Sequence, residues 1–490
     1  DEVGRFSASN IVDGDVLLSI KGGPQATVTA RDHVLSFRRE GTANPRAVME
    51  FASIRLARDL FDGRVNAMAC IGRKEITVGW TTSTASWTAW RCISPERPEG
   101  RRKMEHKTYT YENSRRLFER ALKVIPSGVY GHQGPAEGCF IPVDAFPFFS
   151  ERAQGAYFWD ADGNRFIDYM CAYGPNILGY GDPDVDEAAR RQREKEDCVT
   201  APSPVMIDFA ELLVDTVQTA DWAFFAKNGN DVTTLAVMTA RAFTRRKKIV
   251  FFKGYYHGVS PWTQKIDYSG VLKEDVCNNL YADWNDFEGL EALFEAHKGE
   301  IAAVISQPYM HGNFADNELP ADGFWQKVRR LCTEQGALLI VDDVRAGFRL
   351  SLAGSDSYFG FEADLICFCK AIANGYNVSA LCGRDFLKNT VSGISFTGSY
   401  WLSAVPFAAG IACLEKMKKL NLPELLIEKG KRLTDGLTAA ARKHGYDLRA
   451  SGVPSLFYLR IADDDNLMTH QRFIAEMVRR GVYMTNHHNH

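Results

Sequence analysis

Short apolar runs alternate with amphipathic helical segments between about residues 208 and 395. The runs are too short to form helices of their own, and each is followed by a polar loop, so we predict strands that are buried on both faces. Strands that alternate with helices in this way are typical of a mostly parallel sheet covered by helices, an α/β fold. The predicted strands lie at 222–225, 248–252, 301–305, 337–341 and 365–368.

Two further patterns precede this region. Residues 113–125 carry apolar side chains at helical spacing, which predicts an amphipathic helix that stops before Pro126. Residues 156–169 form two alternating arms around an Asp-Gly-Asn turn, which predicts a β-hairpin.

The first 92 residues predict a separate, small α+β domain. Short strands are expected at 16–20, 26–30 and 34–37, then a helix that starts near Ser53, and a last strand at 75–79. The following segment, 93–107, is rich in proline and charge and has no apolar periodicity, so we interpret it as a linker. Because the chain opens with Asp1 rather than Met, we expect this domain to be truncated.

The composition narrows the class of protein. The chain has 490 residues, a net charge of −3 and 45% hydrophobic residues, so it has ample material for buried cores. Its charge gives no reason to expect a nucleic acid or an anionic membrane as partner. The sequence contains no long apolar stretch or signal peptide, and its 11 scattered cysteines are typical of reduced thiols. We therefore expect a cytoplasmic enzyme without a membrane span.

Two chemically complementary side chains follow two of the predicted strands. Asp342 ends the run at 337–341, and Lys370 follows the run at 365–368. The carboxyl ends of parallel strands meet at one edge of a sheet, where ligands gather. The aldehyde of pyridoxal 5′-phosphate (PLP) needs an amine for its Schiff base, and its pyridine nitrogen needs an anion to stay protonated. The pair Asp342 and Lys370 therefore predicts a PLP site.

Other strand ends offer contacts for the same cofactor. Gly229 and Asn230 open a helix, whose backbone N–H groups could hold a phosphate. Tyr256 could stack on the pyridine ring, and His257 beside it is a further candidate contact. Taken alone, each signal is weak: a glycine-rich helix start is common, and Tyr256 could be an ordinary half-buried loop residue. Their order along the chain is what favours the PLP interpretation.

The ends of the third and fourth predicted central strands offer the remaining candidate contacts for the cofactor. Gln307 closes the strand at 301–305, and after Asp342 come Val344 and Arg345. We expect Val344 to press on the second face of the ring and Arg345 to lie near its phenolic oxygen. The alternative for Asp342 is a simple N-cap.

Residues 108–490 resemble the class III aminotransferases of PLP fold type I, nearest to the glutamate-1-semialdehyde aminomutase branch. The resemblance is carried by the segments 113–121, 159–169, 255–258, 307–308, 342–349 and 370–375. It implies an aspartate-aminotransferase-like fold, with a large PLP-binding domain at 166–395 and a small domain built from 108–165 and 396–490.

The same resemblance implies roles for individual residues. Lys370 would carry the internal aldimine, Asp342 would bind the pyridinium and Tyr256 would stack on it. The family completes its phosphate site with a threonine from the partner subunit. Here Thr397 or Ser399 is the candidate, which implies a homodimer with a shared active site.

The N-terminal domain resembles sterol carrier protein type two, a carrier of apolar ligands. The order of Gly-x-Ala-Asn-Pro, residues 59–65 and residues 71–78 carries this resemblance. It implies an apolar ligand for this domain. The alternative is an accessory domain that only packs or tethers.

Several positions depart from the family pattern. The usual Glu-Pro is Gln307-Pro308, which removes a negative charge, and Arg345 adds a positive one. We expect Arg345 to pair with the phenolic oxygen or with a substrate anion. Asn313 stands where many ω-aminotransferases have a gating glutamate, which argues against their dual-substrate scheme. We interpret the histidines at 486–490 as a chain end, and expect no metal site.

Three functions remain possible from the sequence. We favour an aminotransferase that moves an amino group from an amino-acid donor to an aldehyde or ketone of a specialised biosynthetic pathway. The alternatives are an aminomutase, which needs no external donor, and a non-catalytic lipid-carrier protein with a degenerate PLP domain. Intact Lys370, Asp342 and Tyr256 argue against the last of these.

Overall fold

A computed structural model provides the fold. It describes residues 14–61 with gaps at 22, 32–33 and 43–46, and then 76–80, 109–125, 128, 149–312, 315–464 and 467–485. The expected linker at 93–107, Asn313 and the histidine-rich end at 486–490 lie outside the described residues. Within the described ranges, the structure contains no helix with the length and apolar character needed to cross a membrane.

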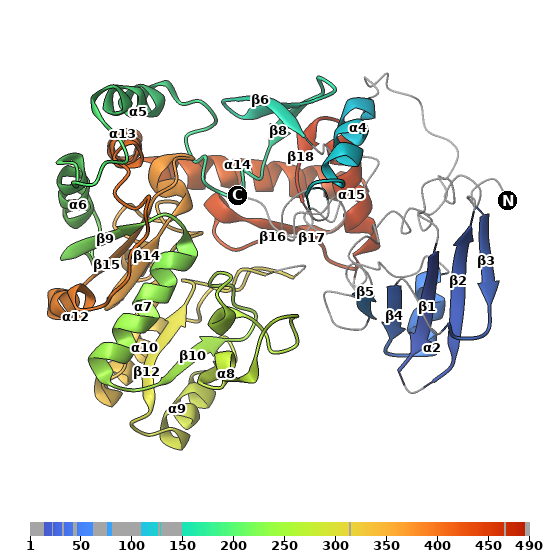
Figure 1. The fold of residues 1–490 in the computed structure, drawn as a ribbon, viewed down its shortest axis with the longest axis horizontal. Helices are drawn as coiled ribbons and strands as arrows, with labels where there is room; N and C mark the ends of the chain where they lie inside the picture. Colours follow the sequence, from blue (N-terminus) through green and yellow to red (C-terminus); the bar gives the residue numbers. More distant parts are fainter. Residues whose placement is uncertain are drawn as a thin grey trace.

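The N-terminal region forms a five-stranded sheet with one helix, α2 (Ile54–Phe61). The strands are β1 (Gly14–Ile20), β2 (Gln25–Arg31), β3 (Val34–Arg38), β4 (Ala47–Phe51) and β5 (Ile76–Trp80), in the order β3-β2-β1-β4-β5 (Figure 1, blue). The predicted strands and helix are confirmed, whereas β4 was not predicted. Leu17, Met49 and Phe51 are buried on this sheet.

The central region is a seven-stranded sheet in the order β11-β10-β12-β13-β14-β15-β9. All neighbours from β11 to β14 pair in parallel, and β15 runs antiparallel to both β14 and β9. The predicted mostly parallel sheet is confirmed. The strands are β9 (Trp222–Ala226), β10 (Lys248–Phe252), β11 (Asn279–Ala282), β12 (Ile301–Ser306), β13 (Leu338–Asp342), β14 (Leu365–Phe368) and β15 (Ser379–Gly383).

Alternate residues of these strands enter two different cores. In β10, Ile249 and Phe251 pack with α7 (Gly229–Thr244) on one face, whereas Val250 and Phe252 pack with α10 (Phe324–Gln335) on the other. Because side chains alternate across a strand, burial of both sets requires helices on both faces. Figure 1 shows this layering. The remaining helices here are α5 (Pro183–Lys195), α6 (Val205–Thr216), α8 (Lys273–Val276), α9 (Phe287–Ala296), α11 (Ser355–Tyr358), α12 (Lys388–Ser392) and α13 (Val405–Leu420).

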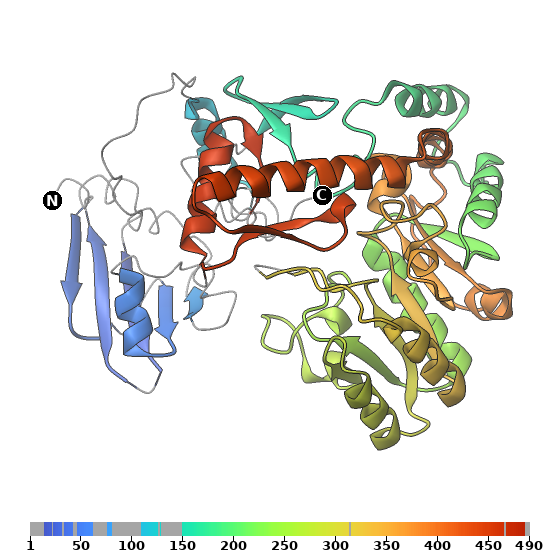
Figure 2. The ribbon, with the colours of Figure 1, turned by 180° about the vertical axis from the view of Figure 1, so that it is seen from behind.

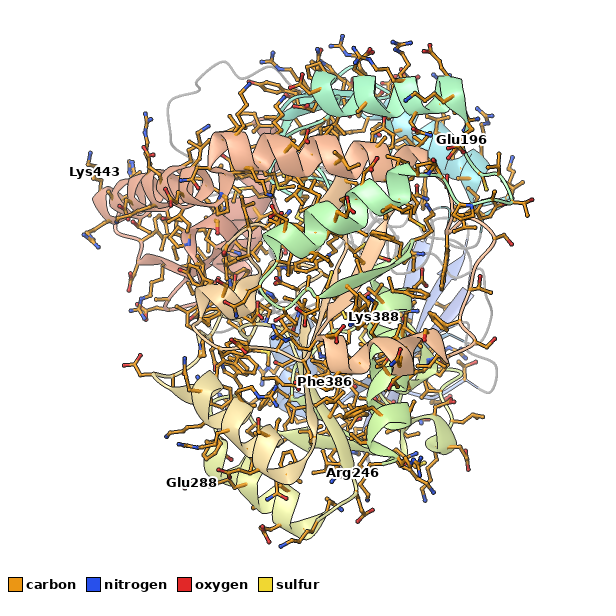
Figure 3. The ribbon with its side chains drawn as sticks, turned by 90° about the vertical axis from the view of Figure 1, so that its left-hand side faces the viewer. Glu196, Arg246, Glu288, Phe386, Lys388 and Lys443 are labelled. Atoms are coloured by element: carbon orange, nitrogen blue, oxygen red, sulfur yellow. The ribbon has the colours of Figure 1, made fainter. Side chains whose placement is uncertain are left out.

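A partly buried arginine links elements at the amino ends of the central strands. The guanidinium of Arg246 donates to the carbonyl of Ile301, at 3.1 Å, and to that of Gln335, at 2.7 Å (Figure 3). These carbonyls belong to the start of β12 and the end of α10, and Arg246 itself lies just before β10. A single side chain therefore links three elements. This end of the sheet lies opposite the edge where Asp342 ends β13.

A third hydrophobic core is built by segments that precede and follow the central region in the sequence. The predicted hairpin is confirmed as β7 (Tyr157–Asp160) and β8 (Arg165–Asp168), in a four-stranded sheet with the order β18-β8-β7-β6. The predicted helix at 113–125 ends earlier, as α4 (Glu112–Ala121). Figure 2 shows the long helix α14 (Leu422–Lys443) crossing this part. The other elements are β6 (Ser150–Gln154), β16 (Leu448–Ser451), β17 (Tyr458–Ile461), α15 (Met468–Arg479) and β18 (Val482–Tyr483).

Candidate active site

Lys370 and Asp342 meet at the carboxyl edge of the central sheet. Asp342 is the last residue of β13 and pairs in register with Cys367 of β14. Lys370 follows β14 and starts a short 3-10 helix with a φ of 46°, in the left-handed region. A non-glycine residue held there costs about 1–3 kcal/mol, and such strain concentrates at functional sites. The strand ends therefore bring the two side chains to neighbouring positions.

The environment makes the amine of Lys370 easy to deprotonate. Burial lowers the pKa of Lys370 to about 8, and the positive charges of Arg345 and Arg349 add to the effect. Cys369 and Asp342 act in the opposite direction but do not overcome it. A substantial fraction of this amine is consequently neutral near pH 8, which is the form that attacks a carbonyl carbon.

Asp342 is held by a histidine. Nδ1 of His257 lies 2.6 Å from Oδ2 of Asp342, and the backbone N–H of Val344 donates to Oδ1 at 3.1 Å. Both side chains are buried, and the His257 ring stacks on Tyr255 at 5.3 Å between centroids. Since a carboxylate only accepts hydrogen bonds, Nδ1 carries the proton. His257 therefore fixes the orientation of the carboxylate.

The first turn of α7 lies close to the segment after β13. A Cβ on Gly229 would stand 2.8 Å and 3.0 Å from the two methyl carbons of Val344, so only glycine fits without movement. Asp231 accepts the N–H groups of Lys227 and Asn228, which fixes the turn that enters the helix. The backbone N–H groups of this first turn can bind an anion.

Asn230 anchors the loop that carries Tyr256. Its Oδ1 accepts the N–H groups of Val259 and Ser260, both at 2.9 Å. Gly258 makes this approach possible with a φ of +115°, because a Cβ there would lie 2.5 Å from that oxygen. The Tyr256 side chain is 55% exposed, on a loop otherwise held firmly at both ends. An exposed ring on an anchored loop is well placed to stack on a ligand.

Two arginines give the site a positive character. Burial lowers the pKa of Arg345 to about 10, although the guanidinium remains charged at neutral pH. Arg349 is buried, and it donates to the backbone carbonyls of Gly174 and Arg345. Gln307 at the end of β12 is buried and uncharged. The positive charges of the two arginines favour an anionic ligand at this site.

Thr397 and Ser399 lie on the segment between α12 and α13, and both are exposed. The backbone carbonyl of Ser399 accepts the thiol of Cys198, at 3.8 Å. Their side chains thus face outward on the single chain.

The sequence reasoning did not single out two buried residues near Lys370. One is Arg349, which lies in the segment 342–349 that carries the family resemblance, but the sequence indicated no role for it. The other is His311, which follows β12 and is 4% exposed. A single histidine after a strand carries no distinguishing signal, so only the fold could bring it to attention.

These features fit pyridoxal phosphate. A neutral amine, a carboxylate with a fixed orientation, a helix start that can bind a phosphate and an exposed aromatic ring are the groups that its aldehyde, pyridinium, phosphate and ring face require. Bound PLP supplies an electrophilic aldehyde and an electron-accepting ring. Within the described residues, no group of three His, Cys, Asp or Glu side chains is arranged to hold a metal ion.

Comparisons with known proteins identify the family of the chain. Residues 141–490 match the family model described as aminotransferase class-III. The chain belongs to the class III aminotransferases, and it is a PLP-dependent aminotransferase. It is 43% identical over 373 residues to an aminopentol aminotransferase of Sphingopyxis macrogoltabida, covering 76% of this chain and 87% of that protein.

One further relative and two solved structures are also similar to the chain. A glutamate-1-semialdehyde 2,1-aminomutase of Francisella philomiragia is 34% identical over 398 residues, which cover 76% of this chain and 91% of that protein. Among solved structures, the PLP internal aldimine form of the FumI protein of Sphingopyxis sp. MTA144 is 43% identical, with a TM-score of 0.74, covering 77% of this chain and 90% of that one. An omega-transaminase from Sphaerobacter thermophilus is 25% identical, with a TM-score of 0.67 and coverage of 76% and 91%.

The close packing of Gly229 gives a first prediction. In Gly229→Ala, the added methyl must displace Val344, whose branched side chain has little rotamer freedom. We expect the dissociation constant for PLP to rise about tenfold, which corresponds to a loss near 1.4 kcal/mol. Equilibrium dialysis of the apo protein against PLP measures this change.

The double variant Gly229→Ala, Val344→Ala is the matched control. It removes the obstructing methyl carbons, so affinity should return to that of Val344→Ala alone. Equal PLP affinity in the parent and in Gly229→Ala would contradict the steric argument.

Proposed function

We propose that Lys370 holds the cofactor aldehyde through Nζ and that Asp342 holds the pyridine nitrogen. Tyr256 and Val344 would cover the two ring faces, while Gly229 and Asn230 would hold the phosphate. His257 would act through Asp342, and Gln307 would border the site. The 2.6 Å contact between His257 and Asp342 and the lowered pKa of Lys370 support these roles.

Lys370 would also move the proton during the reaction. Once the incoming amine has displaced it, its Nζ can accept the proton from the amine-bearing carbon. Because burial favours its neutral form, Lys370 can do so near neutral pH. Nζ of Lys370 would then give this proton to the carbon that the bound cofactor supplies, and water would hydrolyse the bond to the substrate carbon. The carbonyl product would leave, and the nitrogen would stay on the cofactor for the carbonyl acceptor.

For the substrate, we propose a hydroxylated aliphatic amine and its carbonyl counterpart in a specialised pathway, with a keto acid as exchange partner. The observation that carries this proposal is the 43% identity to an aminopentol aminotransferase over most of both chains. The identity to a glutamate-1-semialdehyde aminomutase is lower, at 34%. Uncharged Gln307 and partly buried Arg345 also depart from the usual family residues at the site.

The experiment is a donor and acceptor test on the full chain. A hydroxylated amine is mixed with pyruvate, and mass spectrometry follows the carbonyl product while alanine is measured separately. We expect both products in equal amounts, and none when pyruvate is omitted. An isomeric amine formed without any keto acid would instead support an aminomutase and contradict the proposal.

Burial and the charge of Arg345 both lower the pKa of Lys370, and the contribution of Arg345 can be tested. Because the charge of Arg345 lowers the Lys370 pKa, Arg345→Met should raise it above about 8. A neutral amine is needed to capture PLP, so the pH midpoint for cofactor uptake by the apo protein should move upward. Absorbance stopped-flow from pH 6 to pH 10 measures this midpoint. An unchanged midpoint in Arg345→Met would refute the role of Arg345.

We also propose a homodimer with a shared site, in which Thr397 or Ser399 of the partner subunit contacts the phosphate. The exposed positions of both side chains support this arrangement. Light scattering of the full chain should give twice the mass of 54.8 kDa. Removing both hydroxyl groups should weaken PLP binding without dissociating the dimer, whereas a monomer would rule the arrangement out.

For the N-terminal region, we propose a sterol-carrier-like domain over 1–92 that binds an apolar ligand, joined by a linker at 93–107. The small sheet with one helix and buried Met49 and Phe51 supports it. A fluorescent fatty acid should bind the full chain and be displaced by unlabelled lipid. Limited proteolysis should cut first within 93–107. Absence of lipid binding would leave an accessory domain as the alternative.

A further inference from the structure

The turn that Lys370 begins is short, and strained backbone lies at both of its ends. It is a single 3-10 turn, η4 (Lys370–Ala373), and both Lys370 and the following residue, Asn374, lie in the left-handed region, with φ of 46° and 47°. Short 3-10 turns have poor hydrogen-bond geometry, and left-handed backbone is costly for residues other than glycine. Contacts from outside the turn must therefore keep it in this conformation.

The side chain of Asn374 makes two such contacts. Its Nδ2 donates to the carbonyl of Gly179 at 2.9 Å, and its Oδ1 accepts the N–H of Leu178 at 2.8 Å. Asn374 is 6% exposed, so water competes little for these bonds. The backbones also pack closely here, since a Cβ on Gly375 would lie 2.8 Å from Oδ1 of Asn176. Both ends of one amide group thus bind a segment 195 residues away in the chain.

The other end of that segment, residues 174–179, is bound to the loop after β13. The guanidinium of Arg349 donates to the carbonyl of Gly174 and, at 3.1 Å, to the carbonyl of Arg345. β13 and β14 are neighbours in the sheet. The loops that follow these two strands therefore hold the 174–179 segment together, one through Arg349 and the other through Asn374.

The apolar side chains of the turn hold it in a different way. Ala371, Ile372 and Ala373 are fully buried in the hydrophobic core that includes residues of α13. Apolar packing is non-directional, whereas a hydrogen bond weakens when its angle changes. Packing consequently sets how deeply the turn is buried, and the two bonds of Asn374 set its rotation. The direction in which the Lys370 side chain leaves the turn depends on that rotation.

We propose that Asn374 is a positioning residue, which holds the turn so that Nζ of Lys370 reaches the cofactor aldehyde. This inference rests on the proposed role of Lys370, whose reaction joins Nζ to the aldehyde carbon and releases one water molecule. A misplacement of about 1 Å in a reacting group can cost about a hundredfold in rate. Loss of the two bonds should therefore slow the reaction of Lys370 without weakening the initial binding of PLP.

The test follows PLP capture by the apo protein and needs no substrate. Stopped-flow absorbance at increasing PLP concentration gives a half-saturation concentration, which reports initial binding, and a plateau rate, which reports bond formation by the amine. The measurement is made at pH 9, where Lys370, with a pKa of about 8, is mostly neutral. Asn374→Gly should lower the plateau rate by at least about tenfold and leave the half-saturation concentration unchanged. Glycine is chosen because it adopts left-handed backbone without strain.

Asn421→Gly is the matched control. Asn421 ends α13 with the same φ of 47°, and its side chain donates to Glu424, outside the site. This variant should capture PLP at the parental rate. Asn374→Asp keeps the acceptor for Leu178 but loses the donor to Gly179, so its plateau rate should lie between those of the parent and Asn374→Gly. If thermal unfolding shows that Asn374→Gly does not fold, Asn374→Asp decides.

Borohydride reduction of the loaded protein, followed by mass spectrometry, identifies the lysine that captured PLP. A parental plateau rate in the deciding variant, a change in the half-saturation concentration alone, or an equal loss in Asn421→Gly overturns the role of Asn374 and leaves that of Lys370 intact. If the parent carries the label on another lysine, the proposed role of Lys370 fails, and the positioning role of Asn374 falls with it.

Discussion

Lys370→Ala should lose turnover by about four orders of magnitude or more, because one change removes both the amine that we propose captures PLP and the base that we propose moves the proton. The fold should persist. Lys370 already occupies a left-handed backbone position with a φ of 46°, and alanine meets the same strain there. Burial also disfavours the charged amine, so its removal relieves a desolvation cost.

Three measurements check this expectation: steady-state turnover, the visible absorption band of the bound cofactor, and thermal unfolding. Lys253→Ala is the matched control, because this lysine also follows a central strand but is exposed and paired with Asp283, at 2.7 Å. It should keep the absorption band and parental activity. Substantial turnover by Lys370→Ala with a parental band would mean that another residue carries the cofactor.

The sequence predicted the central strands well because they are buried on both faces. A strand such as β12 is a continuous apolar run, and a pattern of that kind can be read without tertiary information. The meeting of Asp342 and Lys370 followed from the rule that parallel strands present their carboxyl ends at one edge. Five predicted strands therefore also located the candidate site.

The elements that were not predicted depend on tertiary context. β15 has the sequence Ser-Ala-Leu-Cys-Gly, whose small residues and glycine give weak strand propensity, yet it is fixed by pairing with both β14 and β9. β11 is a short edge strand. In both cases the neighbouring strands supply the stability that the local sequence lacks.

The polar contacts inside the site also could not be predicted from the sequence. The bond between His257 and Asp342 joins residues far apart in the chain, and the sequence suggested only that His257 might touch the cofactor. Similarly, the use of the Asn230 oxygen by Val259 and Ser260 depends on the path of a loop. Such pairings are set by the fold, because each polar atom bonds to whatever partner burial brings to it.

Asp342→Asn should lower kcat by about a thousandfold, the upper range for losing one electrostatic contact in a buried site. Asparagine has the same shape and can still accept the N–H of Val344, so the loop should stay in place. The substitution removes the negative charge that, in the proposed arrangement, would keep the pyridine nitrogen protonated and the ring able to accept electrons. Steady-state kcat and PLP affinity by dialysis measure the two consequences separately.

Asp343→Asn is the matched control for this charge. Asp343 is equally buried but is used within the fold, because it accepts the N–H and the hydroxyl of Ser355 at 3.0 Å and 2.5 Å. Burial raises the pKa of Asp343 to about 7, above its value in the unfolded chain, so its ionisation weakens the folded state as pH rises from about 4 to 7. Asp343→Asn should therefore keep most of the turnover and show a flatter unfolding free energy over that pH range. If both variants lost kcat equally, the special role of Asp342 as counter-ion of the cofactor would have to be abandoned.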